Sequence, residues 1–160
     1  MYTINFSITR EHIYNGVFAT SAHTARAREA MGIPVDITGR MLLTADDKHV
    51  IAPLIDNSVN EVSCDIVRHH PGSSVEFNRN GDDGEYLFNI TVPMNYPTGN
   101  AGMLATIIGD YIVNRTLQSW YTDIKPDEAN AAATKAQNNA GTIQALLTQR
   151  IKPTDITLKE

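Results

Sequence analysis

The amino-acid sequence predicts an α+β fold, in which an N-terminal strand and a β-hairpin form a small antiparallel sheet packed with about four helices. Apolar and polar residues alternate strictly over 2–8, and over 86–92 four apolar residues alternate with Leu87, Asn89 and Thr91, a pattern typical of half-buried strands. The remaining segments repeat their apolar residues every three to four positions, a pattern typical of helices. Because neither a linker nor an internal repeat divides the chain, we expect one domain over 1–150, followed by an extended tail over 151–160.

Composition limits the class of protein. The chain has 160 residues, of which 42% are hydrophobic and 19% charged, as expected for a globular domain with a real core. Its net charge of −5 lacks the basic footprint of proteins that grip nucleic acid. The single cysteine, Cys64, excludes an intrachain disulfide and favours a reducing compartment. Neither a signal peptide nor an apolar run of roughly 18 residues is recognisable, so we expect no secretion and no membrane span.

The first half of the chain predicts a strand and two helices. The strand over 2–8 places four apolar side chains on one face, namely Tyr2, Ile4, Phe6 and Ile8. A helix follows over 10–32, with Ile13, Val17 and Ala25 as its apolar residues and Gly32 as its stop. Residues 33–40 are predicted to be a loop.

Thr44 then caps the second helix, with Asp47 as the partner in a weak capping box. Pro53 is expected to kink this helix or to mark its true start. Its apolar stripe is predicted to be Val50, Leu54, Ile55, Val59, Val62 and Ile66.

The second half predicts a β-hairpin and a helical hairpin. The hairpin turns at 81–84, and its second strand directs Tyr86, Phe88, Ile90 and Val92 to one face. A third helix begins at Pro97 and Thr98 and is central to the core through Met103, Leu104, Ile107, Ile108, Tyr111, Ile112 and Leu117. A fourth, alanine-rich helix has Pro126 at its first position, where Asp127 and Glu128 suit the positive end of the helix dipole.

Residues that could carry chemistry are few. Cys64, His69 and His70 are the only close Cys/His group. Their spacing matches no zinc motif, so we interpret Cys64 as a small buried residue and the histidines as a polar helix end. A Cys64–histidine catalytic pair stays open, since such partners can be distant in sequence. Two pairs of adjacent carboxylates, at 46–47 and 82–83, fit a helix start and a hairpin turn better than a calcium loop.

No cofactor or metal site is predicted. Residues 99–102, "GNAG", lack the spacing of a phosphate-binding loop. Trp120 and Tyr121 lie at the corner of the helical hairpin. A tryptophan there can plug the core, with its indole N–H bonded to a nearby carbonyl, or anchor a contact with another protein. The core plug is the favoured interpretation.

Several short motifs carry a resemblance to a known group of proteins. They are Thr44–Asp47, Glu85–Val92, Ser119–Tyr121, Glu128–Ala129 and Arg150–Pro153. In this layout the chain resembles small structural proteins of tailed phages and prophages of gut bacteria. The resemblance implies a ring-forming head–tail connector (adaptor) or tail-completion subunit, present in several copies below the portal. Such a subunit extends the DNA channel, docks the tail and has no enzymatic activity.

This resemblance sets the expected partners. They are further copies of the chain, portal or tail proteins, and DNA that only passes through, within a virion assembled in the host cytoplasm and without membrane contact. Ring subunits meet through two unlike faces, and strand edges or extended termini supply such contacts. The predicted interface residues are Tyr2, Ile4, Phe6, Trp120, Tyr121, Ile151, Pro153, Ile156 and Leu158.

Two alternatives remain open. The chain could hold another phage structural position, such as a tail terminator, a minor tail protein or a head decoration protein. It could also be a small enzyme or ligand-binding protein, which requires a deep pocket with perturbed ionisable groups. In that case Cys64, His69 and His70 are expected to meet a carboxylate in one cleft.

Overall fold

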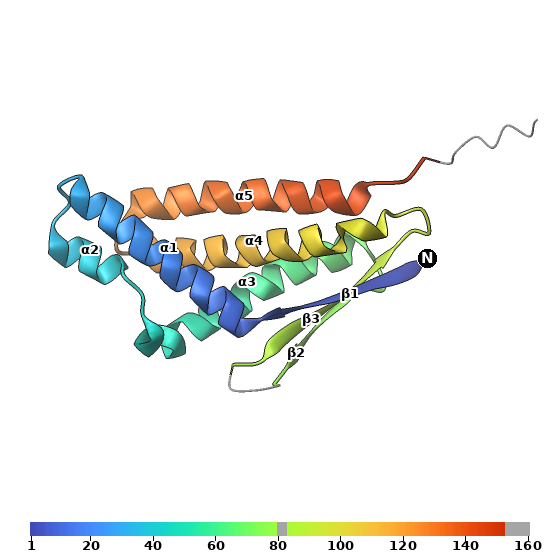
Figure 1. Ribbon diagram of the computed structural model, residues 1–160, viewed down its shortest axis with the longest axis horizontal. Helices are drawn as coiled ribbons and strands as arrows, with labels where there is room; N and C mark the ends of the chain where they lie inside the picture. Colours follow the sequence, from blue (N-terminus) through green and yellow to red (C-terminus); the bar gives the residue numbers. More distant parts are fainter. Residues whose placement is uncertain (80–82, 153–160) are drawn as a thin grey trace, which may run out of the picture.

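A computed structural model describes residues 1–79 and 83–152 and confirms the α+β class. The described elements follow one another along the chain, and η1 and η2 are single 3₁₀ turns (Figure 1). In order they are β1 (Tyr2–Thr9), α1 (Arg10–Ala30), α2 (Val35–Met41), η1 (Ala45–Asp47), α3 (Lys48–His69), β2 (Ser74–Asn78), β3 (Glu85–Val92), η2 (Thr98–Asn100), α4 (Ala101–Tyr121) and α5 (Pro126–Thr148).

The three strands form an antiparallel sheet in the order β1-β3-β2. The first strand pairs with β3 along its whole length, from Tyr2 opposite Val92 to Thr9 opposite Glu85. This register places the predicted apolar residues of β1 and β3 on the same face, where Ile4, Phe88 and Ile90 are buried. The sheet is therefore covered by helices on one face only, as the period-two pattern requires.

Helix α4 is the centre of the molecule, as predicted. It packs against α5, α3, α1 and β1, and Leu104, Ile108 and Ile112 are fully buried along it. Alanines at 129, 132 and 136 face α4 from α5, and their small side chains let the two helix axes approach closely. Figure 1 shows α4 and α5 side by side, with their connecting turn near α2 and their other ends near the start of β1.

Both ends of α1 are capped, and Gly32 follows its last turn as the predicted stop. Thr9 accepts a hydrogen bond from the His12 backbone N–H at 3.2 Å and caps the helix. After the last turn, Gly32 takes φ +91°. The Gly32 N–H donates to the Glu29 carbonyl, and the Ile33 N–H donates to the Arg28 carbonyl. These two hydrogen bonds form the glycine-terminated Schellman motif.

The predicted loop over 33–40 is wrong, because Val35–Met41 form helix α2. Seven residues are too few to hold a helix by propensity alone. Tertiary packing stabilises α2 instead, since Thr38 and Met41 are buried against the rest of the protein. The order β-α-α-β-β-α-α therefore gains one helix.

The predicted apolar stripes of α3 and α4 are wrong only near their N-terminal ends. On α3 Ile51 is buried and the predicted Val50 is exposed, and on α4 the predicted Met103 is exposed. The other predicted positions are buried or half-buried, namely Leu54, Ile55, Val59, Val62 and Ile66 on α3 and Leu104, Ile107, Ile108, Tyr111, Ile112 and Leu117 on α4.

The start of α3 combines one confirmed and one corrected feature. Thr44 and Asp47 form the predicted capping box, in which the Thr44 N–H donates to Asp47 Oδ2 at 2.8 Å. The helix begins at Lys48 and continues through Pro53, so Pro53 does not mark its start.

Part of the predicted sequence features lies outside the described residues. These are Pro153, Ile156 and Leu158 with the rest of the predicted tail beyond residue 152, and Gly81 and Asp82 of the predicted turn.

Candidate functional site

The predicted interface residues divide into buried and accessible groups. Tyr121 and Ile4 are 2% and 6% exposed, so these two side chains belong to the protein's own core and their assignment to an interface is corrected. Phe6 stacks on Phe88 with ring centroids 5.2 Å apart and is half-buried. Tyr2 is also half-buried and donates its hydroxyl hydrogen to the Tyr96 carbonyl at 2.8 Å. Ile151 is exposed.

Trp120 has the geometry of the predicted core plug. Its indole Nε1–H donates to the carbonyl oxygen of Met41 at 3.3 Å. Met41 is the last residue of α2, where backbone carbonyls lack partners within the helix. The indole therefore fastens α2 to the end of α4.

An ion pair that no sequence pattern predicts lies at the same end of the molecule. Glu128, in the first turn of α5, is buried and pairs with Arg28 near the end of α1. The two residues are 100 positions apart, so no local pattern announces the contact. The pair joins α1 to α5 and neutralises the carboxylate.

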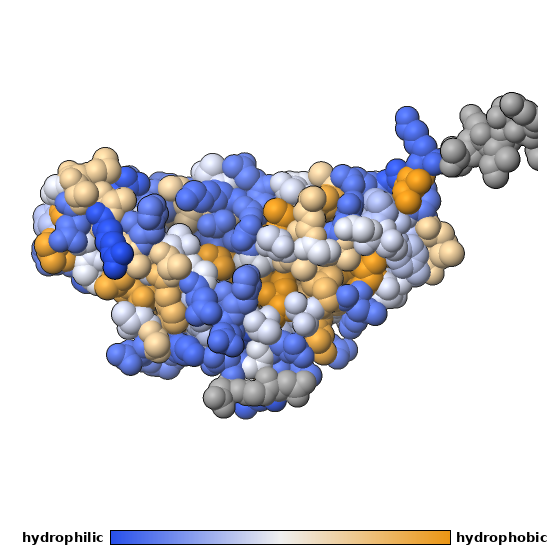
Figure 2. Space-filling model, viewed as in Figure 1, coloured by the Kyte–Doolittle hydropathy of each residue, from blue (hydrophilic) through white to orange (hydrophobic). Residues whose placement is uncertain are grey.

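Exposed apolar side chains gather at both ends of the molecule. Met31, Val35 and Leu42 flank or begin α2 and are 41% to 71% exposed; we call this surface the α2 end. Met94, Met103 and Ile151 are 57% to 75% exposed and form a second surface, the α5 end. Figure 2 shows apolar residues at the surface around α2 and at the opposite end, where α5 finishes.

Hydrogen bonds hold the three segments of the α5 end together. The Ile151 N–H donates to the Asn95 carbonyl at 2.7 Å, which ties the residues after α5 to the loop after β3. Asn100 Nδ2 donates to Gln149 Oε1 at 2.5 Å, which ties the start of α4 to the end of α5. Met94, Met103 and Ile151 therefore share one end although they come from three separate segments.

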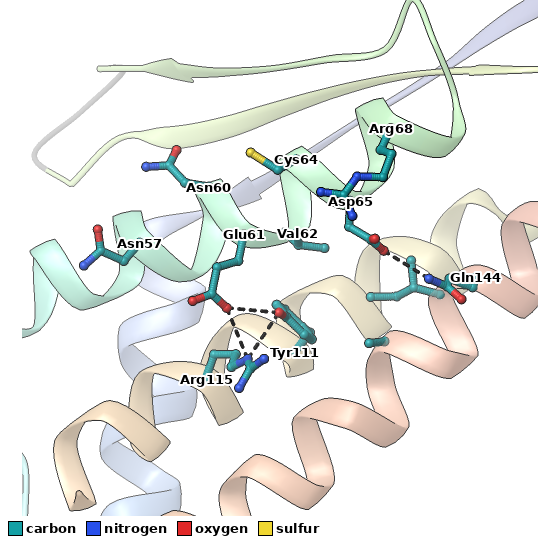
Figure 3. A pocket seen from close by; sticks show the side chains of 12 residues that line it. Asn57, Asn60, Glu61, Val62, Cys64, Asp65, Arg68, Tyr111, Arg115 and Gln144 are labelled. Carbon is teal, nitrogen blue, oxygen red and sulfur yellow. Dashed lines mark hydrogen bonds and ion pairs between the residues drawn. The ribbon is translucent and has the colours of Figure 1, made fainter.

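A groove of about 810 Å³ lies between α3, α4 and α5. Arg115 lies 3.2 Å from Glu61 and donates to the Tyr111 hydroxyl at 3.2 Å. Burial raises the pKa of Tyr111, which keeps its hydroxyl protonated as a donor to Glu61 at 3.3 Å. These groups satisfy one another and join α3 to α4 (Figure 3).

Cys64 does not form the catalytic cluster considered above. It is exposed rather than buried, because it follows Val62 by two residues and so lies off the apolar stripe of α3. Figure 3 shows Cys64 and Asn60 pointing away from Glu61, Tyr111 and Arg115. His69 and His70 line a separate hollow beside the end of α5, so the cysteine and the histidines do not converge.

A second polar cluster holds the hairpin against the helices. Arg10 pairs with Asp56 and donates from Nε to the Tyr86 hydroxyl at 2.9 Å, while that hydroxyl donates to Asp56 at 2.5 Å. Burial raises the pKa of Tyr86, so the phenol keeps its proton. The guanidinium also lies over the Phe77 ring, 4.4 Å from its centroid. Each polar group here already has a partner, which favours a structural role.

Within residues 1–79 and 83–152, no group of three or more His, Cys, Asp or Glu side chains is placed to hold a metal ion. In the same residues, none of the helices combines the length and the apolar character needed to cross a bilayer.

Comparison of the chain with protein-family models, with curated proteins and with solved structures gives no match.

Proposed function

We propose that the chain is a structural subunit of a tailed-phage virion, which assembles into a ring at the head–tail junction and connects the portal to the tail. The sequence motifs described above support this role by resemblance. The structural observation that carries the proposal is the edge of the sheet at β1.

The β1 strand is a long edge that lacks the usual protection. It lies at one side of the order β1-β3-β2, and in the described part of the chain its backbone pairs only with β3. Natural sheets protect such edges with charged residues, proline or bulges. Tyr2–Thr9 contains no charge and no proline, and its register with β3 is unbroken. Such an edge suits the addition of a strand from another chain.

The outer face of the sheet also suits a channel wall. Residues on this face include Thr3, Asn5 and Ser7 of β1, which are exposed, and their neighbours on β2 and β3. The charged residues among the described strand positions on this face are the carboxylates Glu76 and Glu85. Without lysine or arginine there, the face offers no cation to hold DNA phosphates, so DNA can pass beside it.

Assembly of the purified protein tests the proposal. Light scattering and negative-stain microscopy should show rings of the protein alone, or a complex with the portal or tail protein encoded beside it. A protein that stays monomeric and binds neither partner would overturn the proposal. Binding to a tail protein, without any binding to the portal, would instead support a tail-terminator or minor tail position.

Matched variants test the edge itself. Asn5→Lys places a charge on the outer face of β1 and should abolish strand addition. Asn89→Lys places the same charge on the same face, directly opposite in register, but on the central strand, where no further strand can add. Assembly lost in both variants, or in neither, would contradict the role given to the β1 edge.

A further inference from the structure

The two apolar ends differ in charge. The α5 end is formed by segments 65–73, 93–101 and 148–152, which contain three cations, Arg68, Arg150 and Lys152, and one carboxylate, Asp65, which lies 3.5 Å from the His69 ring. His69 and His70 lie beside the end of α5 and place the first of these segments there. The α2 end lies near segments 26–47 and 122–128, which contain seven carboxylates and four cations. One end is therefore cationic and the other carries an excess of acidic groups.

The α2 end also offers a recess beside its apolar residues. Met31 and Ile33 line a hollow of about 330 Å³ together with Lys125, Asp127 and Ala131. The Asp127 side chain is 91% exposed at the rim of α5, and its Oδ2 lies 3.8 Å from Lys125 Nζ. Glu128 is already paired with Arg28, so Asp127 is the more accessible carboxylate of this helix start. An apolar side chain with a cation next to it would complement the hollow.

We propose that the α5 end of one copy docks on the α2 end of the next copy. Met94 and Ile151 bury their exposed side chains against Met31 and Val35, and Arg150 and Lys152 face the acidic groups of the α2 end. This inference rests on the proposed function, because it names a second contact between ring subunits, in addition to strand addition at the β1 edge. The contact itself needs no portal or tail protein.

The arrangement of the ends decides the type of assembly. A two-fold dimer joins identical patches, whereas here an apolar cationic surface lies opposite an apolar acidic one. Each copy that docks in this way leaves one surface of each kind free, so addition continues until the rotation closes a ring or an open filament forms. Contiguous exposed apolar residues mark contact sites, and opposite charge fixes which surfaces meet.

Disulfide trapping between two variants tests this contact. Both chains carry Cys64→Ser, since the exposed native thiol would otherwise react. One chain adds Met31→Cys and the other adds Met94→Cys. A disulfide between the chains is expected only in the mixture. A control mixture pairs Met94→Cys with Gln137→Cys, an exposed position midway along α5, and should give no bond.

Each outcome decides one question. Equal trapping of Met31→Cys with itself, or of Met94→Cys with itself, would show a two-fold contact and overturn the inference. Rings without trapping in the mixture would overturn this contact while the proposed ring stands. Trapping without any binding to portal or tail protein would keep the contact and refute the connector role.

Charge reversal gives a second, independent measurement. Arg150→Glu with Lys152→Glu should weaken self-association in sedimentation experiments, and so should Asp36→Lys with Asp127→Lys. A mixture of the two doubly reversed chains should regain association, because the reversed ends again carry opposite charges. Met31→Ser with Val35→Ser should lower the association constant about tenfold or more. Circular dichroism melting checks that these exposed substitutions leave the fold intact, and unchanged association in every variant would overturn the inference.

Discussion

Substitution of Trp120 by phenylalanine should release α2 from the rest of the protein. The indole N–H donates to the Met41 carbonyl at 3.3 Å, which is slightly beyond the usual range for such bonds. Its loss should cost about 0.5–1 kcal/mol, and the smaller ring also loses packing against the core. Together these effects should weaken the docking of α2 by about 1–2 kcal/mol, since the seven-residue helix cannot persist alone.

Hydrogen exchange measured by mass spectrometry is the suitable assay, because it reports local opening. Peptides that cover 35–41 should exchange roughly five- to thirtyfold faster in the variant, as expected for 1–2 kcal/mol. Peptides from the centre of α4 should change much less. Self-association should also fall, because Val35 and Leu42 lie in or beside α2.

Tyr111→Phe is the matched control. It removes a hydrogen bond of equal length, 3.3 Å from the hydroxyl to Glu61, from the same helix but at its contact with α3. Exchange over 35–41 should be unchanged in this variant. If Trp120→Phe left these peptides protected, or if both variants exposed them equally, the indole would not be what fastens α2.

Three further predictions concern stability. Asp56→Ala leaves the Arg10 guanidinium, 16% exposed, without its carboxylate and should cost about 1–3 kcal/mol; urea unfolding equal to that of the parent protein would refute this. Burial raises the pKa of Tyr121 to about 12, above its ordinary value. The contribution of the protonated phenol to the free energy of unfolding is therefore complete below about pH 10 and is lost as pH rises toward 12. Tyr121→Phe should flatten this alkaline loss in melting curves, and an identical pH profile would count against it. Gly84 has φ +78°, and an added Cβ would lie 2.6 Å from an aromatic carbon of Phe77. Gly84→Ala should therefore lower the melting temperature, because the steric clash adds to a backbone strain of about 1–3 kcal/mol. Gly141→Ala, within an exposed part of α5, should leave the melting temperature unchanged or raise it.

Local signals in the sequence predicted most of the fold. The alternation over 2–8 and 86–92 gave both long strands, and their common face follows from the observed register. Thr44 with Asp47 marked the start of the second long helix, and Pro126 marked the start of the last one. These features act within a few residues, so one sequence is enough to reveal them.

Contacts between distant segments were not predictable in the same way. Helix α2 is held by the Trp120 indole, 79 positions beyond Met41, and a short segment with a proline before it resembles a loop when this contact is unknown. The pairs of Arg28 with Glu128 and of Arg10 with Asp56 join residues 100 and 46 positions apart. The burial of Ile51 in place of Val50 depends on which elements pack against α3.

The charge distribution shows why the candidate interface escaped analysis of the sequence. Acidic and basic residues are spread evenly between the two halves of the chain, which gives no sign of a polar axis. Folding brings the ends of α3 and α5 and the loop after β3 together, and these segments contain three cations and one carboxylate, Asp65. The turns between α1 and α2 and between α4 and α5 meet at the other end, where carboxylates are in excess. Because α4 and α5 run antiparallel through the body, each end combines segments from both halves. A chain with uniform charge along its sequence thus folds with two unlike ends, which is the property that the proposed head-to-tail contact requires.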